Sequence, residues 1–84
     1  MNSAHNQQQA FSLICQLIQG VNGTPANQIG LHDSLITDLA MDSVELIDLL
    51  MQLEGHGVVI EESEITPTLT VACLVRHFMS ATEA

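Results

Sequence analysis

Apolar side chains recur at helical spacing in three separate stretches of this chain, and this spacing limits the fold more than any other feature. In the first stretch they lie one turn apart, which predicts a helix over about 4–19 that ends at Gly20. A second helix is expected from Ser43 to about Glu54, and a third after Thr70, which would be its N-cap. The spacing therefore predicts an all-α fold.

A long connection, about 20–42, joins the first two predicted helices. A loop of this length is uncommon in a compact domain unless it carries a function. Apolar residues within it are expected to pin it to the core, namely Ile29, Leu31, Leu35, Ile36 and Leu39. A short helical turn is expected around Glu62–Ile65. We interpret residues 1–84 as one domain with an ordered core of about 5–79, a small three-to-four-helix bundle with a long first loop.

Charge is distributed unevenly along the sequence. The chain has ten acidic residues and one basic residue, Arg76, for a formal net charge of −9. Residues 1–32 contain no Asp, Glu, Lys or Arg, whereas nine of the acids fall within 33–64. A single base cannot form a phosphate-binding surface, so nucleic-acid binding is excluded. The acidic stretch favours basic partners, or it serves as a solubilising face.

The sequence also suggests a location and a redox state. No apolar run approaches the roughly 20 residues of a membrane span, and the first ten residues do not resemble a secretory signal. We therefore expect a cytoplasmic protein without a membrane span, which we take to be a monomer. Cys15 and Cys73 are expected to be small buried apolar residues, with a disulfide or a reactive thiol as the alternative.

Catalytic and metal-binding patterns are absent from the sequence. The four histidines (His5, His32, His56 and His77) lack the spacing of a metal site, and we expect no metal. No general base is placed beside a nucleophile, so we expect no catalytic residues.

One serine occupies a position that suits covalent modification. Ser43 begins the second predicted helix at the end of the long loop. The simplest interpretation makes it the helix N-cap. The same position favours an attached phosphate, because the N-terminus of a helix stabilises negative charge by about 0.3–1 kcal/mol. Asp42, Glu45 and Asp48 would present an acidic surface to a modifying enzyme.

The residues around this serine resemble the acyl carrier protein family. The family pattern is an acid and Leu, two small or apolar residues, Asp-Ser-Leu and then an acidic amphipathic helix. Residues 38–54 read DLAMDSVELIDLLMQLE, and the likeness extends from about Ala10 to Phe78. Ala40 stands where the family usually has Gly. The resemblance adds to the helical pattern already described and agrees with its layout.

A second Asp-Ser-Leu triplet, Asp33-Ser34-Leu35, tests the register of this resemblance. Choosing Ser34 would put Thr37 and Ala40 on the face expected to be apolar. Choosing Ser43 instead puts apolar residues in helical register on that face, namely Ile47, Leu50 and Leu53. Ser43 is therefore the predicted site.

The resemblance implies that Ser43 carries phosphopantetheine through a phosphodiester, transferred from coenzyme A by a separate Mg²⁺-dependent phosphopantetheinyl transferase. The terminal thiol would hold acyl or polyketide intermediates as thioesters, so the chain would be a non-catalytic carrier. A specialised fatty-acid, polyketide or other secondary-metabolite pathway is expected. The other partners would be acyl-transferring, condensing or modifying enzymes with basic docking surfaces.

The resemblance also assigns two groups of residues around Ser43. Partner recognition is expected at Asp42, Val44, Glu45, Asp48, Met51 and Glu54. An acyl-chain pocket is expected at Ile47, Leu50, Val58 and Ile60, with ordinary core packing as the alternative for these four and for Met51.

Two other functions are compatible with the sequence. A peptidyl or aminoacyl carrier would share the chemistry, although Asp42 and the net charge favour the acyl version. An unmodified acidic helical adaptor would bind basic partners and need no particular serine. Ser43→Ala separates these classes, because it would abolish loading of a carrier and leave an adaptor intact.

Overall fold

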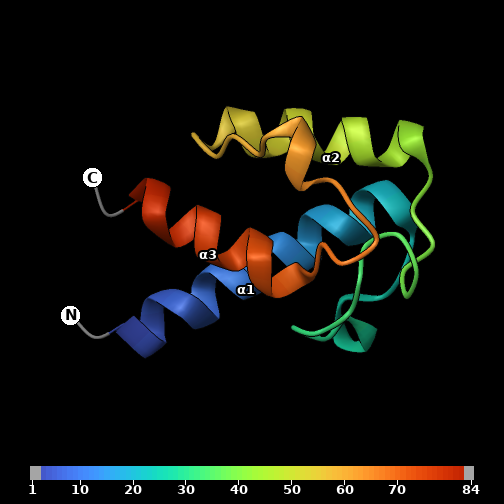
Figure 1. Ribbon diagram of the computed structural model, residues 1–84. Coiled ribbons are helices and arrows are strands. Elements are labelled where there is room, and N and C mark those ends of the chain that lie inside the picture. The colour runs from blue at the N-terminus through green and yellow to red at the C-terminus, as the bar shows by residue number, and fades with distance from the viewer. Residues whose placement is uncertain (1–2, 83–84) are drawn as a thin grey trace.

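The computed structural model describes the backbone of residues 3–82 and the side chains of residues 7–80. Within them the chain forms three α-helices and two short 3-10 turns. In order these are α1 (Ser3–Asn22), η1 (Ala26–Gln28), α2 (Ser43–Gly55), η2 (Glu62–Glu64) and α3 (Val71–Thr82). No strand occurs in the described part of the chain, so the predicted all-α class and the long first loop are confirmed (Figure 1).

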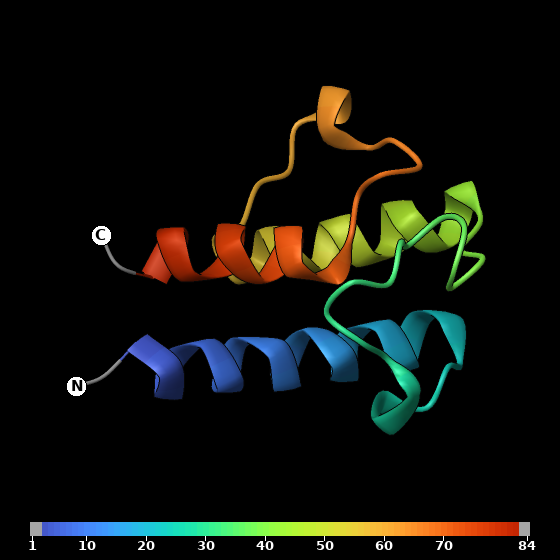
Figure 2. The same ribbon diagram turned by 60° about the horizontal axis from the view of Figure 1, so that its bottom comes forward.

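The longest helix, α1, is the element against which the others pack. It contacts both α2 and α3, and both of those helices run antiparallel to it (Figures 1 and 2). The start of α1 and the end of α3 therefore lie at the same end of the molecule. The fully buried side chains between the helices include Ile14, Ile18, Leu49, Leu53, Leu74 and Val75. None of the described helices is both long and apolar enough to cross a membrane.

α1 extends beyond the predicted end at Gly20. It continues to Asn22 and stops before Gly23, which has a φ of +88°. The N–H of Gly23 donates to the carbonyl of Gln19 at 2.9 Å, a common way to end a helix with a left-handed residue. Gly20 lies within the helix, and the residue after it, Val21, is half-buried against the core.

The long first loop is held by backbone hydrogen bonds to the start of α3. Leu35 N donates to Leu69 O at 3.0 Å, while Val71 N and Ala72 N donate to loop carbonyls, at 3.0 Å to Asp33 and 2.8 Å to Leu31. The bonds from Val71 and Ala72 satisfy the first N–H groups of α3, which have no partner inside the helix.

Thr70 caps α3 through its backbone only. Its carbonyl accepts from Cys73 N and Leu74 N, as expected of an N-cap residue. Its hydroxyl donates to Cys73 Sγ at 3.5 Å and caps no backbone N–H. The sequence predicted that Thr70 caps α3. In the structure the carbonyls of Leu31 and Asp33, and not the Thr70 side chain, accept from the first N–H groups of the helix.

Ala40, in the loop just before α2, is the only non-glycine residue with a positive φ among the described residues, at +54°. This left-handed conformation costs a residue with a Cβ about 1–2 kcal/mol. Glycine avoids that cost, but it has more freedom to lose on folding.

We expect Ala40→Gly to raise the free energy of unfolding by about 0.5–1 kcal/mol, measured by urea denaturation. The matched control is Gly23→Ala, where φ is +88° and no atom would obstruct the added Cβ. That variant should lower the free energy of unfolding. A lower value for Ala40→Gly would show that the left-handed conformation of Ala40 is not strained.

Candidate functional site

The N-terminus of α2 is closed by Asp42. Its Oδ1 accepts from Glu45 N at 2.8 Å, and Glu45 Oε1 accepts from Asp42 N at 3.3 Å. These reciprocal bonds form a capping box, which satisfies two backbone donors at once. Asp42 is therefore the N-cap, and Ser43 is the first residue of the helix. The interpretation of Ser43 as the N-cap is wrong by one residue.

This arrangement leaves the Ser43 hydroxyl available. Ser43 is exposed, and within residues 7–80 no group forms a hydrogen bond with its Oγ. The backbone N–H groups of Ser43 and Val44 lie in the first turn, where no intrahelical acceptor exists. A nucleophilic oxygen thus lies at a helix N-terminus, which stabilises an attached negative group.

Ser34, in the competing triplet, has a different environment. It is 6% exposed, and its Oγ donates to Pro67 O at 2.7 Å and accepts from Thr37 N at 3.2 Å. Its backbone N–H donates to Asp38 Oδ2 at 2.7 Å. The hydroxyl of Ser34 therefore links the first loop to the segment before α3 and is closed to an external enzyme.

An apolar stripe with acidic neighbours extends along α2 from Ser43. Val44 is 75% exposed and Met51 is 65% exposed, so Met51 does not pack in the core. Asp42, Asp48 and Glu54 are exposed beside them. Five of the six expected recognition residues thus face solvent. The sixth, Glu45, is half-buried, because its Oε1 also accepts from Asn22 Nδ2 of α1 at 2.9 Å.

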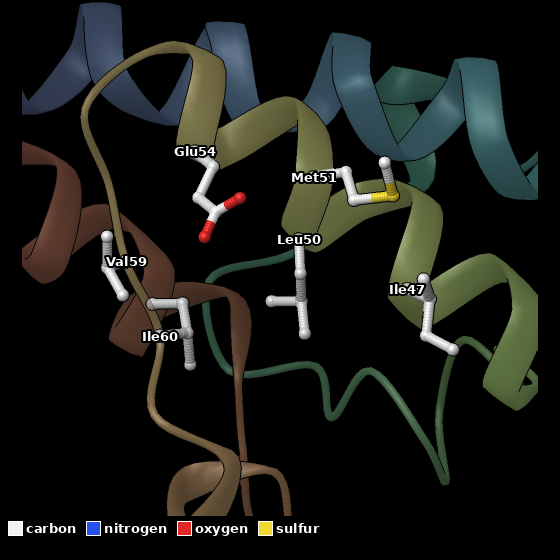
Figure 3. A pocket seen from close by; sticks show the side chains of 6 residues that line it. All are labelled: Ile47, Leu50, Met51, Glu54, Val59 and Ile60. Carbon is white, nitrogen blue, oxygen red and sulfur yellow. The ribbon is translucent and has the colours of Figure 1, made fainter.

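A groove of about 200 Å³ lies between α2 and the segment that follows it (Figure 3). Leu50 and Ile60 point into the space between the two segments. The lining residues are Ile47, Leu50, Met51, Glu54, Val59 and Ile60. Three of the four expected pocket residues therefore line it. The fourth, Val58, is 1% exposed and belongs to the core, while its neighbour Val59 takes the place at the groove.

The histidines are dispersed over the fold. His77 Nε2 lies 2.7 Å from Glu64 Oε1, which joins α3 to η2, and the ring of His56 lies 6.2 Å from that of Phe78. His32 is exposed, and the side chain of His5 lies outside the described residues. Over residues 7–80, no three His, Cys, Asp or Glu side chains are grouped so as to hold a metal ion.

Three curated relatives and one family match this chain. Residues 12–78 match the family described as phosphopantetheine attachment site. The chain is 24% identical to an acyl carrier protein of Rhodococcus erythropolis over 88% of its own length and 82% of the relative's. It is 29% identical to an acyl carrier protein of Thermotoga maritima, over 86% and 90%. It is 25% identical to a meromycolate extension acyl carrier protein of Mycolicibacterium aurum, over 95% and 84%.

The two cysteines are free thiols in contrasting environments. Cys15 is buried, and burial raises the pKa of its thiol. Cys73 is half-buried, and hydrogen bonds from Thr70, followed by the nearby Arg76 guanidinium, lower the pKa of its thiol. A lower pKa means a larger thiolate fraction at any pH below the ordinary value, and the thiolate is the reactive form.

We expect iodoacetamide at mildly alkaline pH to alkylate Cys73 about tenfold faster than Cys15, measured by peptide mass spectrometry. Thr70→Val removes the hydroxyl that donates to Cys73 Sγ and should slow alkylation of Cys73 without affecting Cys15. Equal rates at the two thiols would contradict the assignment of Cys73 as the reactive one.

Proposed function

The chain belongs to the phosphopantetheine attachment site family of acyl carrier proteins, and we propose that Ser43 is its attachment residue. Members of this family are carriers without catalytic activity, and phosphopantetheine is their cofactor. The observation that carries the proposal is the contrast between two serines. The hydroxyl of Ser43 is exposed at the start of α2, whereas that of Ser34 is buried and bonded to Pro67.

The residues at the start of α2 fit a phosphodiester. Ser43 Oγ would form a bond to the phosphorus of the pantetheine-bearing phosphate of coenzyme A as the anhydride P–O bond breaks. The hydroxyl proton would pass to a base of a separate transferase, and the adenosine bisphosphate part would leave. The free N–H groups of Ser43 and Val44 favour the negative charge that remains. When attached, the arm supplies a terminal thiol that holds an acyl group as a thioester.

The cargo in this proposal is an acyl or polyketide intermediate of a specialised pathway. Similarity to the meromycolate extension acyl carrier protein supports specialisation, as does a first helix without Asp, Glu, Lys or Arg. The groove gives the acyl chain apolar side chains to lie against, from Ile47 one turn after Ser43 to Leu50 and Ile60. The carrier is one domain over residues 1–84 and acts as a cytoplasmic monomer, in keeping with the mutual repulsion of copies with a net charge of −9.

The partners in this proposal are enzymes that have a basic rim around an apolar contact. The exposed Val44 and Met51 of α2 provide the apolar contact, and the exposed N-cap Asp42 provides charge together with Asp48 and Glu54 of α2. Such an arrangement speeds encounter with basic surfaces and helps to orient them. Transferases, condensing enzymes and acyl-modifying enzymes would share this one surface, because each must reach the same serine.

Incubation with coenzyme A and a promiscuous phosphopantetheinyl transferase should increase the intact mass of the protein by one phosphopantetheinyl group. Ser43→Ala should show no increase. Ser63→Ala, which removes another exposed hydroxyl, should be modified like the wild type. An unmodified wild-type protein would favour the adaptor function instead. A mass increase that survives Ser43→Ala would move the site elsewhere.

Reversing the charge of Asp48 should weaken encounter with the transferase. We expect Asp48→Lys to raise the KM for the carrier about three- to tenfold at low salt. Glu62→Lys makes the same charge change on the exposed surface of η2 and should have a smaller effect. Both effects should shrink as added salt shortens the Debye length to about 10 Å at 0.1 M. Equal effects of the two substitutions would show that only net charge matters.

A further inference from the structure

Asn22, the last residue of α1, forms side-chain hydrogen bonds with both the first loop and α2. Its Oδ1 accepts from the hydroxyl of Thr24, in the first loop, and its Nδ2 donates to Glu45 Oε1 of α2 at 2.9 Å. The end of α1 lies beside the start of α2 in both views of the fold (Figures 1 and 2). Both polar atoms of the Asn22 carboxamide are therefore engaged, and one of them reaches the helix that carries Ser43.

Glu45 Oε1, the atom that accepts a hydrogen bond from Asn22, is also the atom that completes the capping box. Glu45 Oε1 accepts from Asp42 N at 3.3 Å as well as from Asn22. Exposed carboxylate side chains in a first helical turn sample several rotamers, and helix ends tend to fray. A donor from a second helix restricts the Glu45 side chain to the conformation that closes the turn.

Ser43 lies between the two residues of this box. Asp42 precedes Ser43 and Glu45 follows it, and two hydrogen bonds join these flanking residues. The backbone that carries Ser43 cannot shift without breaking one of these bonds. The transfer of a group to Ser43 Oγ requires the oxygen to be in line with the attacked phosphorus, and small misplacements are costly to such reactions.

We propose that Asn22 is a positioning residue for group attachment at Ser43, acting through Glu45. This inference rests on the proposed function. Asn22 donates to Glu45, Glu45 closes the first turn of α2 on Asp42, and the closed turn presents Ser43 Oγ in one orientation. Glu45 then acts inward, towards α1. The exposed Asp48 and Glu54 then supply the negative charge on α2 that docks basic partners.

The experiment measures kcat and KM for the appearance of the modified mass, using the full chain, coenzyme A and the transferase. N22A should lower kcat about fivefold with KM nearly unchanged, because the exposed docking residues are untouched. N27A, which truncates an exposed asparagine in η1, should match the wild type. Circular dichroism at the assay temperature gives the folded fraction. A role in stability alone would leave kcat of the folded protein unchanged.

Two further comparisons test the route through Glu45. If Asn22 acts through that carboxylate, N22A/E45A should lose no more than E45A alone. N22D places a carboxylate beside Glu45 and should lower kcat about tenfold. Adding E45Q lets the side-chain amide at position 45 donate to the new carboxylate at position 22, and it restores the original net charge. N22D/E45Q should therefore recover most of that loss in kcat. The N22D and N22D/E45Q pair carries the test if N22A lowers the folded fraction.

The outcomes separate this inference from the function on which it rests. A wild-type protein that gains no phosphopantetheinyl group refutes the proposed function. A modified wild type with an unchanged kcat in N22A refutes the positioning role alone. A rise in KM in N22A would assign Asn22 to docking, and additive losses in N22A/E45A would show that it does not act through Glu45. Either result overturns the proposal.

Discussion

A short backbone pairing between the first loop and the start of α3 holds the long connection in place. The carbonyls of Leu31 and Asp33 accept from the first N–H groups of α3, and Leu35 donates to Leu69. A buried backbone group without a partner costs free energy comparable to a lost hydrogen bond, so this pairing is needed once the segments come together. With the loop held there, Leu35 and Met41 reach the core, and the chain enters α2 in a defined direction.

The start of α2 separates residues that hold the structure from residues that remain free. Asp42 and Glu45 bond to each other and, through Asn22, to α1. Because Asp42 provides the cap, the hydroxyl of Ser43 is not needed for it. Had Ser43 been the N-cap, its oxygen would have accepted from the first turn and been less available to an enzyme. The displacement of the cap by one residue therefore matters for the chemistry of the site.

Helical spacing was enough to predict the three helices, because the hydrophobic effect selects the same period in sequence and structure. It did not predict the details that depend on neighbours in space. Gly23 ends α1 because its backbone adopts a positive φ, and Val58 is buried while Val59 lines the groove. In an extended segment of three apolar residues, only the packing partner decides which side faces inward. Glu45 was expected to face partners, and a donor from another helix turned it inward.

The sequence by itself determined the all-α class, the position of the long loop and the acidic character of residues 33–64, because these depend on local period and composition. It also placed Ser43 at the start of a helix. Tertiary structure decided how Ser34 is buried and bonded, because the acceptor of its hydroxyl, the carbonyl of Pro67, lies far along the chain. The same holds for the groove and for the contact between Asn22 and Glu45. Asn22 and Glu45 are distant in sequence and meet only when α1 and α2 pack together, whereas the groove forms where the segment after α2 lies beside that helix.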